Sequence, residues 1–114
     1  MSGQDLYTEL DKKVKALNTA LSEYRKRGIA FAQAEHNYRI ALAKGILIQR
    51  AEGLPVTIIQ DICKGEEGIA KLRLNRDIAE TLYKSAGEAI QSYKLQIRIL
   101  ESEISREYSS VGYT

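Results

Sequence analysis

The chain of 114 residues is long enough for one domain, and 44% hydrophobic with 28% charged residues is the balance of an ordinary globular protein. Its net charge of +2 is well below the basic excess of most dedicated nucleic-acid-binding proteins. A lone cysteine excludes an internal disulfide. A polar start and the lack of an apolar run of about 20 residues predict neither secretion nor a membrane span, so we expect a cytoplasmic protein.

The first predicted element is a long helix over residues 5–51. Two columns of residues repeat every seven positions, the second four places behind the first: Leu10, Leu17, Tyr24, Phe31 and Tyr38, then Val14, Leu21, Gly28, Glu35 and Leu42. Alternating steps of four and three are typical of a helix packed along another helix. Gly53 stands where a C-terminal cap belongs. Gly28 and Gly45 lie inside the helix and indicate either close approach of a partner backbone or a kink.

A short connector helix is predicted over residues 55–64. Pro55 suits the first turn of a helix, and Gly65 would stop it. Val56, Ile59, Ile62 and Cys63 are expected to share one face, with Ile58 nearby, so we expect this helix to plug the closed end of a hairpin. The alternative is a strand, because Val-Thr-Ile-Ile is β-branched, but the chain offers no second strand for it to pair with.

A second long helix is predicted over residues 66–108, followed by a frayed tail at 109–114. Glu66 and Glu67 favour the positive end of a helix dipole. The seven-residue columns here are Ile69, Arg76, Tyr83, Ile90, Ile97 and Ile104, then Leu72, Ala79, Ala86, Tyr93 and Leu100. Two long helices joined by a compact connector run antiparallel, so the predicted fold is all-α, a single-domain, coiled-coil-like helical hairpin.

Each long helix also carries a second apolar stripe that a two-helix hairpin cannot bury. We predict that this stripe is an oligomer interface made of Ile29, Ile40, Leu47, Leu74, Ile78 and Leu82. An exposed apolar patch of that size usually marks a protein contact. The simplest outcome is a homodimer that completes a helical bundle, and the alternative is a bent monomer that folds back on itself.

Two charged residues, Glu35 and Arg76, occupy positions in the columns where apolar residues belong. Unpaired burial of either charge would be costly, so we predict that they pair in a buried polar layer that fixes the register of the helices. The alternative is a polar pocket for a ligand.

Catalytic and cofactor motifs are absent from the sequence. His36 is the only histidine and has no nucleophile beside it, so we expect it on the surface. Cys63, on the apolar face of the connector, is expected to be a small buried hydrophobe. With no phosphate loop, metal spacing or paired carboxylates, we expect no catalytic, metal or cofactor-binding residues and a protein that is not an enzyme.

Basic residues form a candidate surface for nucleic acid or another partner: Arg25, Lys26, Arg27, Lys71 and Arg73. Tyr24 beside the first three would allow base stacking next to phosphate contacts. The alternative is an ordinary solvated helix face, because Asp and Glu are interspersed along both helices. The connector followed by the third helix also has the outline of a helix-turn-helix, but its second helix would begin with acidic residues where phosphate should bind.

Six short segments between about Tyr24 and Tyr108 carry a resemblance to known proteins: Ala34-Glu35, Tyr38 to Lys44, Glu52 to Thr57, Lys64-Gly65, Arg76 to Glu80 and Tyr83-Lys84. Over this range the chain resembles small uncharacterised proteins encoded by phages and prophages of Gram-positive bacteria. The resemblance implies a bacterial host cell as the setting and transfers no activity. Genes of such proteins often lie near replication and recombination genes.

We therefore expect a phage or prophage accessory protein that acts by binding a protein partner, such as a replication or recombination component or a host factor. One alternative is an inhibitor of a bacterial defence system such as a CRISPR nuclease. Another is a single-stranded nucleic-acid-binding protein.

Overall fold

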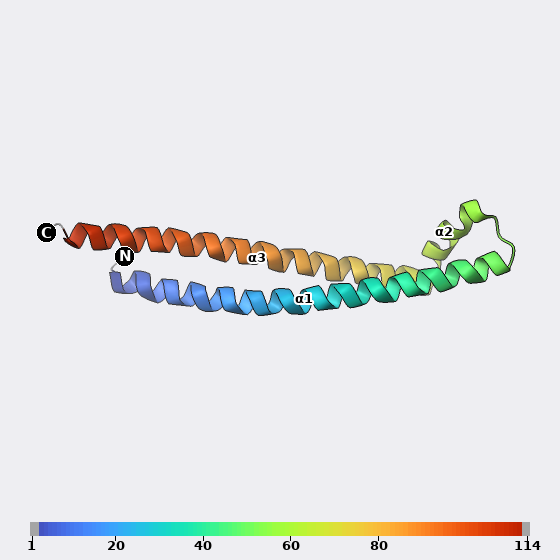
Figure 1. The fold of residues 1–114 in the computed structure, drawn as a ribbon, viewed down its shortest axis with the longest axis horizontal. Coiled ribbons are helices and arrows are strands. Elements are labelled where there is room, and N and C mark those ends of the chain that lie inside the picture. Colours follow the sequence, from blue (N-terminus) through green and yellow to red (C-terminus); the bar gives the residue numbers. More distant parts are fainter. Residues whose placement is uncertain (1–2, 113–114) are drawn as a thin grey trace. The chain divides into compact units, whose positions relative to one another are not determined.

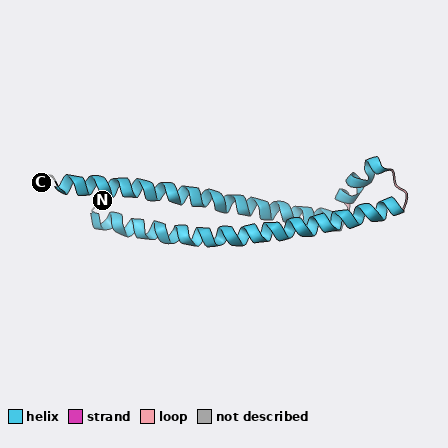
Figure 2. Ribbon diagram, in the orientation of Figure 1, coloured by secondary structure: helices cyan, strands magenta, loops and turns pink. Residues whose placement is uncertain are grey.

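The computed structural model describes residues 3–112, which form three helices: α1 (Gly3–Ala51), α2 (Val56–Gly65) and α3 (Glu67–Gly112). Figures 1 and 2 show these helices and the short connections between them. The described residues contain no strand, so the β-branched run in α2 is helical. The predicted all-α hairpin, with two long helices and a short connector helix, is confirmed.

Two compact units divide the chain, and both long helices run through both of them. Unit 1 pairs the first part of α1, up to Arg25, with the part of α3 from Lys84 onward. Unit 2 is Lys26–Tyr83 and holds the rest of α1, all of α2 and the start of α3. The helix pairing is antiparallel in each unit, because the positions in contact rise along α1 as they fall along α3.

Unit 1 is a two-helix pair whose best-buried side chains are Leu6, Ile90 and Leu100. Most of its predicted column residues are buried or half-buried, which confirms that they face the other helix. Val14 is the exception, at 40% exposed. The helices come close at Gly87, where an added Cβ would lie 3.2 Å from a ring carbon of Tyr24.

Unit 2 has a three-helix core at its closed end. The buried residues are Tyr38 of α1, Ile59 and Cys63 of α2, and Ile69 of α3. Ile59 and Cys63 are four residues apart and so lie on one face of α2, which packs against the two long helices. The prediction that the connector helix plugs the hairpin is therefore confirmed, as is the burial of Cys63. Val56 and Ile62, predicted on the same face, are instead 74% and 41% exposed, because α2 contacts the core along Ile59 and Cys63.

The turn from α1 to α2 depends on Gly53, which has a positive φ of 83°. The N–H of Leu54 donates to the carbonyl of Gln49 at 3.2 Å, and the N–H of Gly53 donates to that of Arg50 at 3.1 Å. This pair of bonds is the Schellman motif, which favours glycine because a Cβ is strained in the left-handed region. Pro55 is the N-cap residue of α2, so the helix begins at Val56, one place after the predicted start, and includes Gly65 as its last residue.

The turn from α2 to α3 depends on Glu66. Its backbone is extended, which ends α2 after Gly65, and its carboxylate folds over the start of α3. Oε1 accepts the N–H of Gly68 at 3.0 Å and Oε2 accepts that of Ile69 at 2.9 Å. These two bonds lower the pKa of Glu66, because they stabilise the ionised carboxylate.

The C-terminal end of α3 corrects the prediction. The helix continues to Gly112 instead of ending at Tyr108, since residues 109–111 include neither proline nor glycine. The rest of the predicted tail, residues 113–114, lies outside the described residues.

Side chains of α3 pack closely against the two glycines inside α1. A Cβ on Gly28 would lie 3.1 Å from a ring carbon of Tyr83, and one on Gly45 would lie 2.8 Å from Cδ1 of Ile69. These neighbours are side-chain atoms, so the structure shows close side-chain packing at both positions in place of the predicted approach of a partner backbone.

Candidate interaction surface

The closed end of unit 2 has a hollow on each side of α2. The core face of this helix carries Ile59 and Cys63. Ile62 lies on one flank, and Gln60 and Lys64 lie on the other. Successive residues are about 100° apart around a helix, so residues adjacent in the sequence of α2 can line different hollows.

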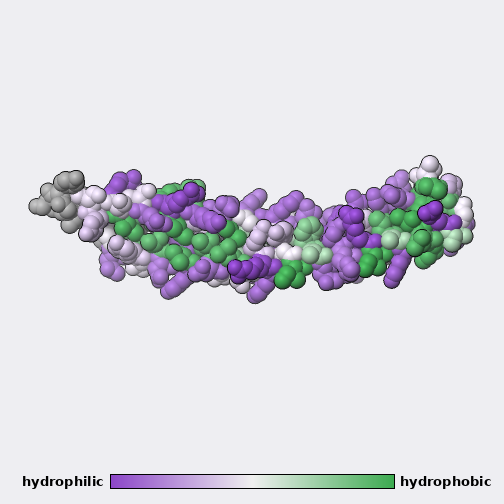
Figure 3. Space-filling model, viewed as in Figure 1, coloured by the Kyte–Doolittle hydropathy of each residue, from purple (hydrophilic) through white to green (hydrophobic). Residues whose placement is uncertain are grey.

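The apolar hollow, of about 400 Å³, lies between α1, α2 and the start of α3. Its apolar lining includes Ile48, Ile62, Cys63 and Ile69, and Lys44, Gln49 and Glu66 add polar groups. Ile48 is 57% exposed and Ile62 is 41% exposed, although both are aliphatic. Hydrophobic atoms gather at this end of unit 2 in Figure 3, over α2 and the adjoining end of α1.

The basic hollow, of about 450 Å³, lies on the other flank of α2. Each helix contributes one cation to it: Arg39 from α1, Lys64 from α2 and Arg76 from α3. Gln60 adds an amide, and α1 supplies the remaining, largely apolar lining: Tyr38, Leu42, Ala43 and Ile46. This hollow offers several hydrogen-bond donors and positive charges above an apolar surface.

A charged network adjoins the basic hollow. Glu35 receives a bond of 2.6 Å from Nε of Arg39 and a longer one of 3.4 Å from Nη1 of Arg76. Arg76 also bonds Asp77 at 2.8 Å, and its guanidinium carbon lies 4.7 Å from the ring centroid of Tyr38. Glu35 and Arg76 therefore pair as predicted, but the layer is half-buried rather than buried. Their side chains are 29% and 20% exposed, because the pair reaches the rim of the helix contact.

The network shifts the pKa values of both partners toward the charged forms. The hydrogen bond from Arg39 is the main cause that lowers the pKa of Glu35, and the charge of Arg76 adds to it. The pKa of Arg76 is raised, chiefly by its hydrogen bond to Asp77. Both groups are thus held ionised, which is the behaviour of a charged structural pair and not of a general acid or base.

All six residues predicted to form an oligomer interface belong to unit 2 and are exposed. Four of them, Ile29, Ile40, Leu74 and Ile78, lie two positions from a column residue, which places them about 200° around the helix from it. Leu47 follows Ile40 by seven residues and Leu82 follows Ile78 by four, so each lies on the same side of its helix as that neighbour. They therefore form two strips that face away from the helix contact: Ile29, Ile40 and Leu47 on α1, and Leu74, Ile78 and Leu82 on α3. One flat interface cannot include both strips.

The basic residues predicted as one surface are not brought together in unit 2. Lys26 and Arg27 lie about 20 Å along α1 from the level of Lys71 and Arg73, at 1.5 Å per residue. Lys71 and Arg73 themselves point about 160° apart around α3. Arg25, which belongs to unit 1, is exposed. The four cations of unit 2 do not make a continuous track for a phosphate backbone.

Catalytic or metal-binding groups do not converge in the part of the chain that the structure describes. His36 is exposed, as predicted. Across residues 3–112, no group of three or more His, Cys, Asp or Glu side chains could hold a metal ion. No helix in the same range is long and apolar enough to cross a membrane.

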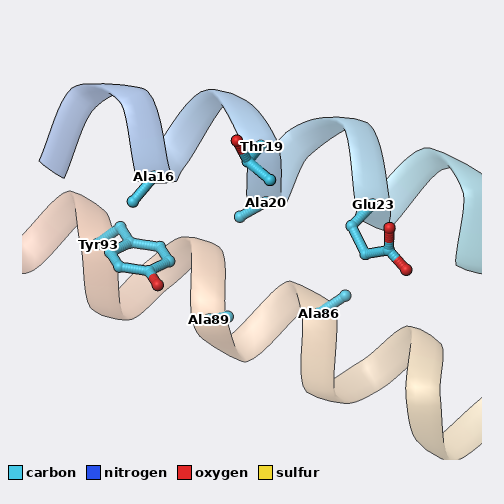
Figure 4. A pocket seen from close by; sticks show the side chains of 7 residues that line it. All are labelled: Ala16, Thr19, Ala20, Glu23, Ala86, Ala89 and Tyr93. Carbon is cyan, nitrogen blue, oxygen red and sulfur yellow. The ribbon is translucent and has the colours of Figure 1, made fainter. Parts of the chain in front are cut away.

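Unit 1 has a hollow of about 510 Å³, which is shown in Figure 4. Its lining is mainly small: Ala16, Thr19 and Ala20 with Glu23 from α1, and Ala86 and Ala89 with Tyr93 from α3. The ring of Tyr93 lies beside Ala16, and the alanines leave space along the helix contact. The hollow has no cation and only one carboxylate.

Three residues of the basic hollow were not predicted from the sequence: Arg39, Gln60 and Lys64. The spacing of Gln60 and Lys64, four apart on a short helix, indicates a shared face. It does not indicate that this face turns toward Arg39, because that depends on how α2 docks. No known family model, curated protein or solved structure matches the chain, so the site rests on its own geometry.

Proposed function

We propose that this protein is a non-enzymatic binding module that acts on a protein partner through the α2 end of unit 2. The observation that carries the proposal is the exposure of aliphatic side chains around the apolar hollow. Ile48 of α1 is 57% exposed and Ile62 of α2 is 41% exposed, and both line this hollow. Aliphatic side chains gathered around a hollow in this way usually mark a surface that a partner covers.

The physical reason is the cost of leaving this surface in water. Burying apolar area stabilises a complex by roughly 25 cal/mol per Å² before the costs of association are subtracted. A partner side chain inserted between Ile48 and Ile62 would gain contacts on three helices at once. A protein partner fits this surface better than a nucleic acid, because the basic residues do not form a track.

The cellular setting is proposed from the resemblance to phage and prophage proteins. It supports an accessory protein whose partner is a replication or recombination component or another factor of the bacterial host. A role in binding rather than in catalysis is supported by the exposed position of His36 and the burial of Cys63.

The test is affinity capture of partners from a Gram-positive bacterial lysate by the tagged protein, after nuclease treatment. Wild type is compared with Ile62→Glu, which places a charge in the apolar hollow, and with Ile99→Glu, a matched change at an exposed isoleucine of unit 1. We expect a protein that is retained by wild type and by Ile99→Glu and lost with Ile62→Glu.

Circular dichroism checks that Ile62→Glu keeps its helix content, which its exposure favours. Retention by all three proteins alike would exclude the apolar hollow as the working surface. Material that disappears on nuclease treatment would instead favour nucleic-acid binding.

A further inference from the structure

The basic hollow has a different chemistry from the apolar hollow, although both flank α2. We propose that the basic hollow binds an acidic segment of the partner protein, in which an apolar side chain lies beside one or more carboxylates. This inference rests on the proposed function, and it names the chemistry of the partner segment.

The cations of the hollow retain donors for a ligand. Within the described residues, no acidic group lies within ion-pair distance of Lys64, which lines the hollow from α2. Arg39 binds Glu35 through Nε, and its side chain is 76% exposed, so its two terminal nitrogens face solvent. Arg76 is already bonded to Asp77 and Glu35, so it contributes positive charge to the lining of the hollow and fewer free donors.

Charge complementarity selects an anion. The lining has three cations and no acidic side chain, because Glu35 and Asp77 lie beside the hollow rather than in it. The basic excess of the chain also belongs to unit 2, which has nine basic and seven acidic residues, whereas unit 1 has eight of each. An acidic segment is therefore attracted to this unit and then to this hollow.

The lining adds a requirement for an apolar group. Leu42 and Ile46 are partly buried and pack against the core, yet both still line the hollow. A volume of about 450 Å³ is at the small end of ligand sites and suits a few side chains rather than a folded element. A partner segment with a carboxylate at Lys64 and a neighbouring aliphatic side chain over Leu42 would complement both the cations and the apolar lining of the hollow.

Nucleic acid is the weaker candidate for this hollow because no aromatic face is free. Tyr38 is the only aromatic residue of the lining, and it is 4% exposed. The guanidinium of Arg76 already covers its ring at 4.7 Å. Single-stranded nucleic acids are bound through bases stacked on open aromatic rings, which this hollow does not offer.

The test is selection of a random peptide library on the immobilised full chain, followed by titration of the enriched peptides. Lys64→Glu and Arg39→Glu reverse charges in the hollow. Arg50→Glu is the matched control, because Arg50 is an exposed cation of α1 in the same unit and lines neither hollow. An oligothymidylate is titrated in parallel.

We expect enriched peptides that combine Asp or Glu with an aliphatic residue. Lys64→Glu should weaken their binding about tenfold or more, and Arg50→Glu should change it less than threefold. The inference would be overturned if basic or purely apolar peptides, or no peptides, were enriched. It would also be overturned if Lys64→Glu and Arg50→Glu weakened binding equally. Binding of oligothymidylate that Lys64→Glu abolishes would assign the hollow to nucleic acid instead.

The two proposals fail in different ways. If a captured partner is lost with Ile62→Glu but is kept by Lys64→Glu, the protein-binding function stands and the acidic-segment inference is wrong. If nothing survives nuclease treatment, the proposed function itself is wrong.

Discussion

Gly45 of α1 packs directly against the core of unit 2. A Cβ there would lie 2.8 Å from Cδ1 of Ile69 and 3.4 Å from Sγ of Cys63, both of which are buried side chains. Alanine improves helix propensity by about 1 kcal/mol, but overpacking a core typically costs about 1–3 kcal/mol. We predict that Gly45→Ala lowers the free energy of unfolding by about 1 kcal/mol, measured by urea denaturation.

Gly65→Ala is the matched control, because a Cβ there meets nothing within 4 Å and the φ of Gly65 is not positive. This change should leave the free energy of unfolding unchanged or raise it by about 0.5 kcal/mol, because alanine reduces the conformational entropy of the unfolded chain. If Gly45→Ala proves as stable as Gly65→Ala, the core is looser at this point than the structure shows.

Glu66 makes stability depend on pH. Its pKa is lowered in the folded protein by the N–H groups of Gly68 and Ile69, and its ordinary value is 4.5. A carboxylate with a lowered folded pKa stabilises the protein fully above its ordinary pKa, and this contribution is lost as pH falls through the folded pKa. We predict that Glu66→Gln lowers the urea midpoint at about pH 7 and that this difference shrinks as the pH is lowered below the ordinary value of 4.5.

Glu67→Gln is the comparison for this pH effect, since Glu67 is also in the first turn of α3 and makes none of the capping bonds. Glu35, whose pKa is also lowered, is present in all of these proteins, so its titration cancels when they are compared. A difference between Glu66→Gln and wild type that is independent of pH would show that the carboxylate charge is not what caps α3.

At the scale of an element, α2 is a helix of 10 residues held mainly by Ile59 and Cys63. So short a helix is not stable alone and depends on its buried face. Ile59 is 2% exposed, so Ile59→Ala should destabilise the protein by about 3 kcal/mol through lost burial and a cavity. Val56→Ala, at a residue that is 74% exposed, should change stability by no more than about 0.5 kcal/mol.

Amide hydrogen exchange then shows where the stability is lost. With Ile59→Ala, exchange should become faster throughout α2 before it does in the paired parts of α1 and α3 in unit 2. Uniformly faster exchange in all three helices would show instead that α2 and the long helices of this unit unfold as one.

The helices could be predicted from the sequence because their signals are local or periodic. The seven-residue columns identified the faces of α1 and α3 that meet, and Gly53 with Pro55 identified the turn into α2. The capping carboxylate of Glu66 was missed, because an acidic residue near a helix start indicates a favourable charge without specifying a hydrogen bond. The basic hollow was missed because Arg39, Lys64 and Arg76 come from three helices and meet only once α2 has docked.

The pairing of Glu35 with Arg76 shows which features of the structure the seven-residue repeat can predict. Two charges in matching columns predicted that the side chains would meet, and they do at 3.4 Å. Their depth depends on side-chain rotamers and on the neighbours Arg39 and Asp77, which no column includes. The prediction was therefore right about the partner and wrong about the burial.

At the scale of the whole molecule, the exposed strips of unit 2 determine how copies of the chain can associate. The strip on α1 is the more exposed of the two, with Ile29 at 72% and Leu47 at 64%, compared with 57% for Leu74 and 50% for Ile78. A two-fold interface buries the same patch of both copies. Because the strips face away from each other, a closed dimer can cover one of them and must leave the other exposed.

We therefore predict a dimer that forms through the α1 strip, with a mass in light scattering of about twice the 12.8 kDa of the chain. Ile40→Glu should reduce this mass to that of the monomer, because an unpaired charge would be buried at the interface. Ile78→Glu, a matched change on the α3 strip, should leave the mass of the dimer unchanged.

If Ile78→Glu gave the monomer mass and Ile40→Glu did not, the interface would be assigned to α3. Loss of the dimer with both changes would require a head-to-tail contact between the two strips. A wild-type mass equal to that of one chain would contradict self-association altogether, and both strips would then remain available to the protein partner.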